Sequence, residues 1–195
     1  MEIREAIYKR RSIRKFQNKE VSDDIIKALL EDAMAAPSAC NKQPWEFYIV
    51  KDKEKQDQIK KKIMFANHNS PLIIVVCGNK KHTLTKDEND YWIQDASAAI
   101  QNILLSALSF NLGTCWCGLF PIKRRSERVQ KILDLPDYII PLGAIHIGYP
   151  LKEIEGRTQY DESKIHYINN KRLLISNIIN SFFYIDSNKK IYASL

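Results

Sequence analysis

The segment 90–110 constrains the fold most, because a helix formed by it would be apolar nearly all round. A single domain of 195 residues can bury only part of such a helix. We therefore expect self-association through it, as a two-fold homodimer, the commonest closed symmetry. The alternative is a central core helix of a monomer. The apolar residues at helical spacing are Ile93, Ala96, Ala99, Ile100, Ile103, Leu104, Ala107 and Leu108.

The rest of the chain alternates between helical and strand patterns. Residues 72–77 are apolar without alternation, which is typical of a strand covered on both faces. Ser22, followed by two aspartates, predicts a helix start, and Pro37 predicts its end. The other predicted helices cover 3–9, 53–66 and a segment from Ser126 to near Pro136, and the other predicted strands cover 47–50, 113–117 and 142–147.

A cluster of cations surrounds one hydroxyl at residues 10–16. Arginine offers a planar fork of donors that suits phosphate oxygens, and a serine hydroxyl adds a neutral donor. In an extended segment Arg10, Ser12 and Arg14 would share one side, while Arg11 would point the other way. We interpret the cluster as a phosphate clamp, and the alternative is a solvated basic turn.

A polar loop at residues 37–45 lies between the second predicted helix and the strand after it. Its prolines restrict its path, and loops held on a rigid scaffold often carry function. Ser38, Asn41 and Gln43 supply the donors and acceptors that could read the edge of a flat heteroaromatic ring. The alternative is an ordinary helix stop.

Together, the early Arg-x-Ser-x-Arg and the later Pro-Ser-x-x-Asn-x-Gln-Pro-Trp resemble the nitroreductase family of flavin mononucleotide (FMN) enzymes. The similarity continues in the order expected for the family. Residues 95–102 resemble its central helix, 113–118 its flavin-flanking loop and 148–163 its closing segment. The resemblance extends from about residue 3 to residue 167.

The resemblance implies an α+β, nitroreductase-like fold with a central mixed, largely antiparallel β-sheet flanked by helices, in a dimer. It implies FMN as cofactor, NADH or NADPH as reductant, and a small-molecule electron acceptor such as a nitroaromatic or quinone, used in a ping-pong mechanism. The flavin would carry the chemistry, with no catalytic side chain. The implied cofactor-binding residues are Arg10, Arg11, Ser12, Arg14, Trp116, Cys117, Gly118 and Arg157, with Pro37, Ser38, Asn41 and Gln43 from the partner subunit.

The sequence departs from the family pattern in three places. Glu155 replaces a second basic residue before Arg157, and the thiol of Cys117 is expected beside the ring. Residues 171–195 form an extra apolar-rich tail after the flavin-binding domain, residues 1–170. We expect this tail to be helical and to pack on the dimer, since it would otherwise promote aggregation.

Two other functions stay open. One is a specialised family member acting on one metabolite, such as a flavin-cleaving or dehalogenating enzyme, although the short stretch 78–89 leaves little room for an added substrate lid. The other is a non-catalytic protein that binds flavin or nucleic acid. The net charge of +7 suits nucleic acid, but the cations are scattered among acidic residues, so we expect no such partner.

The cysteines and histidines show no metal or redox signature in the sequence. Cys115 and Cys117 lack the spacing of a zinc knuckle or dithiol site, and the four histidines are dispersed. We expect reduced core thiols, no metal and no catalytic histidine. The longest apolar run, 72–77, is too short to cross a bilayer, so we expect a cytoplasmic protein without a membrane partner.

Overall fold

The computed structural model of the chain describes residues 2–63, 66–84, 90–168, 183–185 and 191–193. The chain divides into two compact units, Met1–Arg157 and Thr158–Leu195. The first holds the main sheet and its helices. The second contains a short 3-10 turn, η4 (Glu162–Lys164), and a two-stranded sheet.

A four-stranded antiparallel sheet forms the centre of the first unit, with strand order β1-β2-β4-β3. This confirms the predicted α+β class and the largely antiparallel pairing. A parallel contact is present only as a single bridge between Ser12 and Thr114 in the described part of the chain. The strands are β1 (Trp45–Val50), β2 (Leu72–Asn79), β3 (Gly113–Gly118) and β4 (Ile139–Gly148).

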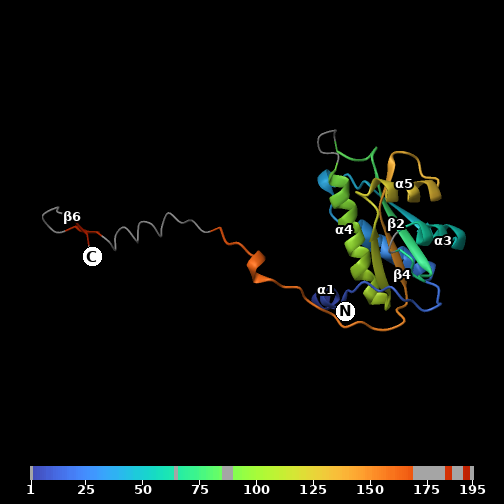
Figure 1. Cartoon of the computed structure of the whole chain (residues 1–195), viewed down its shortest axis with the longest axis horizontal. Coiled ribbons are helices and arrows are strands. Elements are labelled where there is room, and N and C mark those ends of the chain that lie inside the picture. Colours follow the sequence, from blue (N-terminus) through green and yellow to red (C-terminus); the bar gives the residue numbers. More distant parts are fainter. Residues whose placement is uncertain (1, 64–65, 85–89, 169–182, 186–190, 194–195) are drawn as a thin grey trace. The chain divides into compact units, whose positions relative to one another are not determined.

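Helices cover both faces of this sheet (Figure 1). One face packs against α2 (Asp23–Met34) and α4 (Tyr91–Ser106), and the other against α3 (Lys53–Lys62) and α5 (Lys123–Ile132). All eight residues of β2 are buried as a result. The unbroken apolar run of this strand is explained by the two helical layers.

The helix α4 supplies the largest contribution of any helix to the core on its side. Its buried residues include Trp92, Asp95, Ile100 and Ile103. The helix continues into a 3-10 turn, η3 (Ala107–Phe110), which ends at Asn111 in the left-handed conformation with φ 55°. Since Ile93 and other apolar residues of α4 stay partly exposed, packing within one chain covers this helix incompletely.

Two helix boundaries differ from the predictions. The α3 helix was expected to reach residue 66, but it ends at Lys62 because Ile63 is extended, with φ −106° and ψ 120°. The α5 helix was expected to start at Ser126, but it starts at Lys123. Ser126 is buried inside the helix, where its Oγ donates to the carbonyl oxygen of Pro141 at 2.8 Å. A tertiary hydrogen bond, rather than a cap, therefore uses this hydroxyl.

The C-terminal tail was predicted to be helical. Where the structure describes the tail, it shows two short antiparallel strands instead, β5 (Phe183–Ile185) and β6 (Ile191–Ala193). The remaining residues of 171–195 lie outside the described residues, so the rest of that prediction is untested. Among the helices of the described residues, none combines the length and apolarity required to span a membrane.

We predict that Gly78→Ala destabilises the protein by about 1–3 kcal/mol, because a Cβ on Gly78 would overlap the buried indole ring of Trp92. Urea unfolding would measure the change. Gly118→Ala is the matched control, since a Cβ there meets nothing within 4 Å, and its effect should stay within about 0.5 kcal/mol. Equal effects of the two substitutions would contradict this packing.

Candidate functional site

The cation cluster at the N-terminus is fixed to the outer edge of β3. The short helix α1 (Ile3–Lys9) ends just before it, and Ser12 then forms a parallel bridge to Thr114. The amide of Ile13 donates to the carbonyl oxygen of Thr114 at 2.8 Å, and the Ile13 side chain covers Gly113. Backbone pairing therefore places the predicted clamp beside the predicted flavin-flanking strand.

An open pocket of about 620 Å³ lies at this junction. Arg10 and Ser12 line it from the N-terminal segment, and Trp116 and Gly118 line it from β3. The indole of Trp116 packs directly over Gly143 of the neighbouring strand β4, so a side chain there would displace it. The remaining lining residues are Gln101 and Leu104 of α4.

The other two arginines of the cluster point elsewhere. The Nη1 of Arg11 donates to the backbone carbonyl of Glu155, and the Nη1 of Arg14 lies 3.4 Å from the carbonyl oxygen of Ser12. Neither arginine lines the pocket. The structure thus places two of the three expected converging donors, Arg10 and Ser12, at the pocket, and Arg14 is not among the residues that line it.

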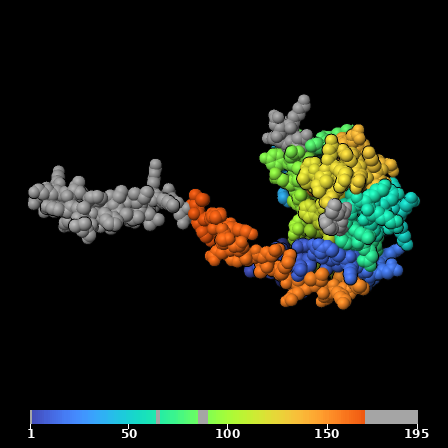
Figure 2. Space-filling view, viewed as in Figure 1, coloured from blue at the N-terminus to red at the C-terminus, as the bar shows by residue number. Residues whose placement is uncertain are grey.

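The closing segment around Arg157 lies against the N-terminal residues that carry the cation cluster. The amide of Arg157 donates to the carbonyl oxygen of Tyr8 at 3.0 Å, and Leu151 bonds in the same way to Lys15. Figure 2 shows the N-terminal residues, in blue, against residues 149–157, the part of the orange segment that belongs to the first unit. Arg157 is therefore held close to the start of the cation cluster, with its side chain exposed.

The polar loop 37–45 is internally braced. Its hydrogen bonds run from the Gln43 amide to Ser38 Oγ at 3.0 Å, and from Gln43 Nε2 to Asn41 Oδ1 at 2.8 Å. Cys40, Asn41 and Gln43 all have positive φ, between 47° and 53°. Non-glycine residues rarely adopt this conformation, and it is often retained at binding sites.

The loop and the pocket lie along different parts of α4. The amide of Ala39 donates to Oδ1 of Asp95 at 2.9 Å, whereas the pocket is lined by Gln101 and Leu104. Along the helix, Asp95 lies about 9 Å from Gln101 and about 13 Å from Leu104. Pro37, Ser38, Asn41 and Gln43 are therefore not among the residues that line the pocket of the same chain.

Cys117 occupies the opposite face of β3 from the pocket. Its side chain is buried with that of Cys115, because alternate residues of a strand point to opposite sides. The thiol is therefore turned away from Trp116 and Gly118, and Cys117 is not among the residues that line the pocket. This placement does not support the expectation that the thiol of Cys117 lies beside a flavin ring.

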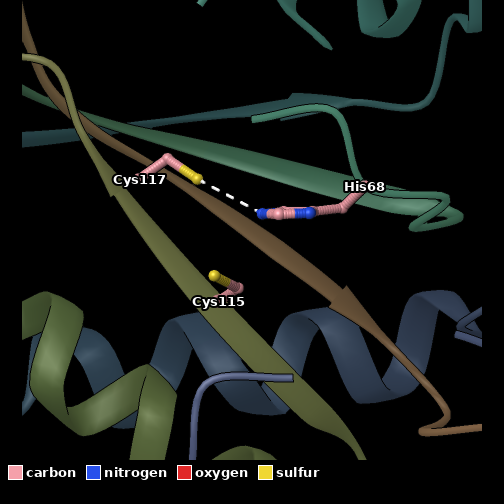
Figure 3. A group of neighbouring side chains, drawn as sticks. All are labelled: His68, Cys115 and Cys117. Carbon is pink, nitrogen blue, oxygen red and sulfur yellow. Dashed lines mark hydrogen bonds between the residues drawn. The ribbon is translucent and has the colours of Figure 1, made fainter. Parts of the chain in front are cut away.

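A cluster of His68, Cys115 and Cys117 fills this second face (Figure 3). The Sγ of Cys117 lies 3.8 Å from Nε2 of His68. The hydrogen bond between the two thiols lowers the pKa of Cys115 to about 7 and raises the pKa of Cys117. Burial lowers the pKa of His68, and it lowers the pKa of the neighbouring His146 to about 3.

Sequence reasoning missed several of these residues. Gln101 and Leu104 lie in the segment 90–110, whose mostly apolar helical pattern gave no sign of a pocket. His68 stands 49 positions from Cys117 in the chain, so no local spacing connects it with the two cysteines. Only the strand pairing and the turn before β2 bring the three side chains together.

Comparison with known proteins identifies the family of the chain. The family model described as "Nitroreductase family" matches residues 7–68 and 61–149. A protein of Methanothermobacter thermautotrophicus, provisionally named NADH dehydrogenase/NAD(P)H nitroreductase, is 37% identical over 168 residues, which is 85% of this chain and 86% of that protein.

Solved structures give the same result. A crystal structure provisionally named in the same way, from Parabacteroides distasonis, has a TM-score of 0.81 and 37% identity, and the match covers 86% of this chain and 98% of that one. An FMN-dependent nitroreductase from Clostridium difficile has a TM-score of 0.75 and 31% identity, covering 85% and 98%. From its motifs, its sheet and these matches, the chain belongs to the nitroreductase family of NAD(P)H oxidoreductases.

Proposed function

We propose that the protein is an FMN-dependent oxidoreductase that passes electrons from NADH or NADPH to a small organic acceptor, such as a nitroaromatic or a quinone, in alternating half-reactions. The observation that carries this proposal is the pocket at the edge of β3, where Arg10, Ser12 and the open backbone of Gly118 meet. The FMN dependence of the Clostridium difficile relative supports the choice of cofactor.

The residues of the pocket fit FMN. A Cβ on Gly118 would meet nothing within 4 Å, so there is open space above the strand for a flat ring to approach the backbone. The guanidinium of Arg10 and the hydroxyl of Ser12 provide a charged and a neutral donor for an anion. A volume of about 620 Å³ lies within the usual range for small-molecule sites.

The protein's part in the reaction is to bind and orient. Arg10 and Ser12 would hold the phosphate or the pyrimidine edge, with Arg157 as a further phosphate contact. Trp116 and Gly118 would lie along the ring, and Arg11 would hold the closing segment through Glu155. FMN, when bound, supplies hydride acceptance from nicotinamide and electron release to the acceptor. Cations near the pyrimidine edge would stabilise the negative charge of the reduced state.

A second chain would complete the site. The loop with Pro37, Ser38, Asn41 and Gln43 is braced and exposed, yet it is separated from the pocket of its own chain along α4. The Oε1 of Gln43 and the Nδ2 of Asn41 are the acceptor and donor that their mutual hydrogen bond leaves for a ring edge. In a two-fold dimer through α4, each loop would reach the partner's pocket.

Flavin content and reduction test the function directly. We expect the purified protein to be yellow and to bleach when NADH or NADPH is added without oxygen, with colour restored by a quinone or nitroaromatic. Absorption spectroscopy would follow each half-reaction separately. A protein that binds no flavin would refute the proposal, and flavin that neither nicotinamide reduces would indicate a non-catalytic binding protein.

Arg10→Ala should weaken FMN binding by about 10- to 100-fold, since a hydrogen bond to a charged group contributes about 1.5–3 kcal/mol. Fluorescence titration of the flavin-free protein would measure the dissociation constant. Arg124→Ala is the matched control, because it removes the same charge from an exposed position of α5. An unchanged dissociation constant in Arg10→Ala would remove this residue from the site.

Mixing two variants, each damaged on one side of the site, tests the shared site at an FMN concentration that leaves each variant alone mostly unloaded. Arg10→Ala damages the pocket side and Asn41→Ala the loop side, so a mixed dimer would contain one intact site. Random pairing after joint refolding would restore about one quarter of the wild-type sites. Arg10→Ala mixed with Gly118→Leu is the control, since both changes lie on the pocket side and no intact site can form. Activity regained equally in both mixtures, or in neither, would contradict a site built from two chains.

A further inference from the structure

We propose that His68, Cys115 and Cys117 form a binding site for one thiophilic metal ion, zinc or copper(I), on the face of β3 opposite the flavin pocket. The cluster lies outside the machinery assigned to the oxidoreductase reaction. Figure 3 shows the three side chains converging from β3 and from the segment before β2.

The ligand chemistry favours such an ion. Thiolate sulfur and imidazole nitrogen are the donors preferred by zinc, and thiolates select copper(I) as well. Strand alternation places Cys115 and Cys117 on one face, two residues apart, and His68 approaches from another segment. Two donors from a rigid strand and one from a separate segment can therefore approach a single ion from different sides.

The distances are close to those of an occupied site. The Sγ of Cys117 and Nε2 of His68 are 3.8 Å apart, and the three donor atoms all lie within 4.8 Å of one another. In a tetrahedral zinc site, with Zn–S about 2.3 Å and Zn–N about 2.0 Å, neighbouring donors are about 3.5 Å apart. Side-chain rotations that move the donors by about 1 Å would complete the coordination.

A second observation points to a ligand at the same place. His146 lies opposite Cys115 in the β3–β4 ladder, and its ring centroid is 4.9 Å from that of His68. Its Nε2 is fully buried and has no hydrogen-bond partner among the described residues. A buried polar atom of this kind costs free energy unless something binds it. This nitrogen lies outside the group of three donor atoms that are within 4.8 Å of one another, so it would have to move closer to serve as the fourth ligand that zinc requires.

The surroundings of His146 resemble the support that metal-binding histidines have. Its Nδ1 lies 2.7 Å from Oγ of Ser70, which fixes the ring plane. Metal-ligating histidines commonly use their second nitrogen in this way. A serine hydroxyl can accept from Nδ1–H, which leaves Nε2 as a lone-pair donor for a metal.

The net charge of the metal complex depends on the metal that binds. Cys115 and Cys117 would each release a proton, and their two thiolates neutralise a zinc ion or leave one net negative charge with copper(I). Arg14 acts electrostatically on both thiols and on His68. A nearby cation favours the negatively charged complex, so Arg14 favours copper(I), whereas a fourth ligand from His146 favours zinc.

Metal titration of the full-length, flavin-loaded protein tests the site. Zinc chloride and, without oxygen, copper(I) would each be titrated against a chromophoric chelator, with metal content measured after dialysis. We expect one retained equivalent of zinc or copper(I) in the wild type, and the ion bound more tightly identifies the preferred metal. Cys117→Ser and His68→Gln should weaken binding by about 100-fold or more, since even supporting residues contribute 10- to 100-fold.

Cys40→Ser is the control, because it removes an exposed thiol outside the cluster and should leave metal binding unchanged. Absence of a retained equivalent of either metal in the wild type would overturn the proposal, as would unchanged affinity in the Cys117 and His68 variants. If these variants do not fold, alkylation of the wild type decides. Bound metal should slow modification of Cys115 and Cys117 at least tenfold and leave Cys40 unaffected, and equal rates with and without metal would refute the site.

Discussion

The pairing of the N-terminal segment with the edge of β3 is the contact on which the site depends. Through the Ser12–Thr114 bridge and the Ile13 amide, it brings a cation cluster that follows a surface helix to the strand that carries Trp116 and Gly118. The return of the chain at Arg157 to Tyr8 closes the same region. A few backbone hydrogen bonds therefore place the N-terminal cations at the pocket and hold Arg157 close to them.

Alternation along β3 gives this strand two separate environments. Trp116 and Gly118 face the pocket, whereas Cys115 and Cys117 are buried with His68 on the other side. Because side chains of successive residues point to opposite faces, the pocket residues and the two cysteines lie on different sides of the same strand. The segment 113–118 serves both the oxidoreductase site and the proposed metal site in this way.

The helix α4 joins the core to the rest of the site. Its buried side fills one face of the sheet, Asp95 braces the polar loop, and Gln101 and Leu104 line the pocket. The loop and the pocket thus share one rigid element but lie about 9–13 Å apart on it. This separation is the physical reason why we place the loop of one chain at the pocket of another.

The sequence by itself determined the family and the order of most elements, and it supplied the proposed anion-binding side chains, because these follow from local periodicity and from motifs a few residues long. The run 72–77 and the helix start after Ser22 were predictable for this reason. The start of α5 was not, since Ser126 bonds to Pro141 across the fold instead of capping a helix. The two short strands within the tail were not predicted either, because the apolar residues of the tail suggested a helix.

Only the tertiary structure decided which side chains meet. It left Arg14 outside the pocket that Arg10 and Ser12 line, turned the thiol of Cys117 away from that pocket, and brought His68 and His146 to the cysteines. These outcomes depend on strand register and on contacts between residues far apart in the chain, and local sequence patterns carry no information about either.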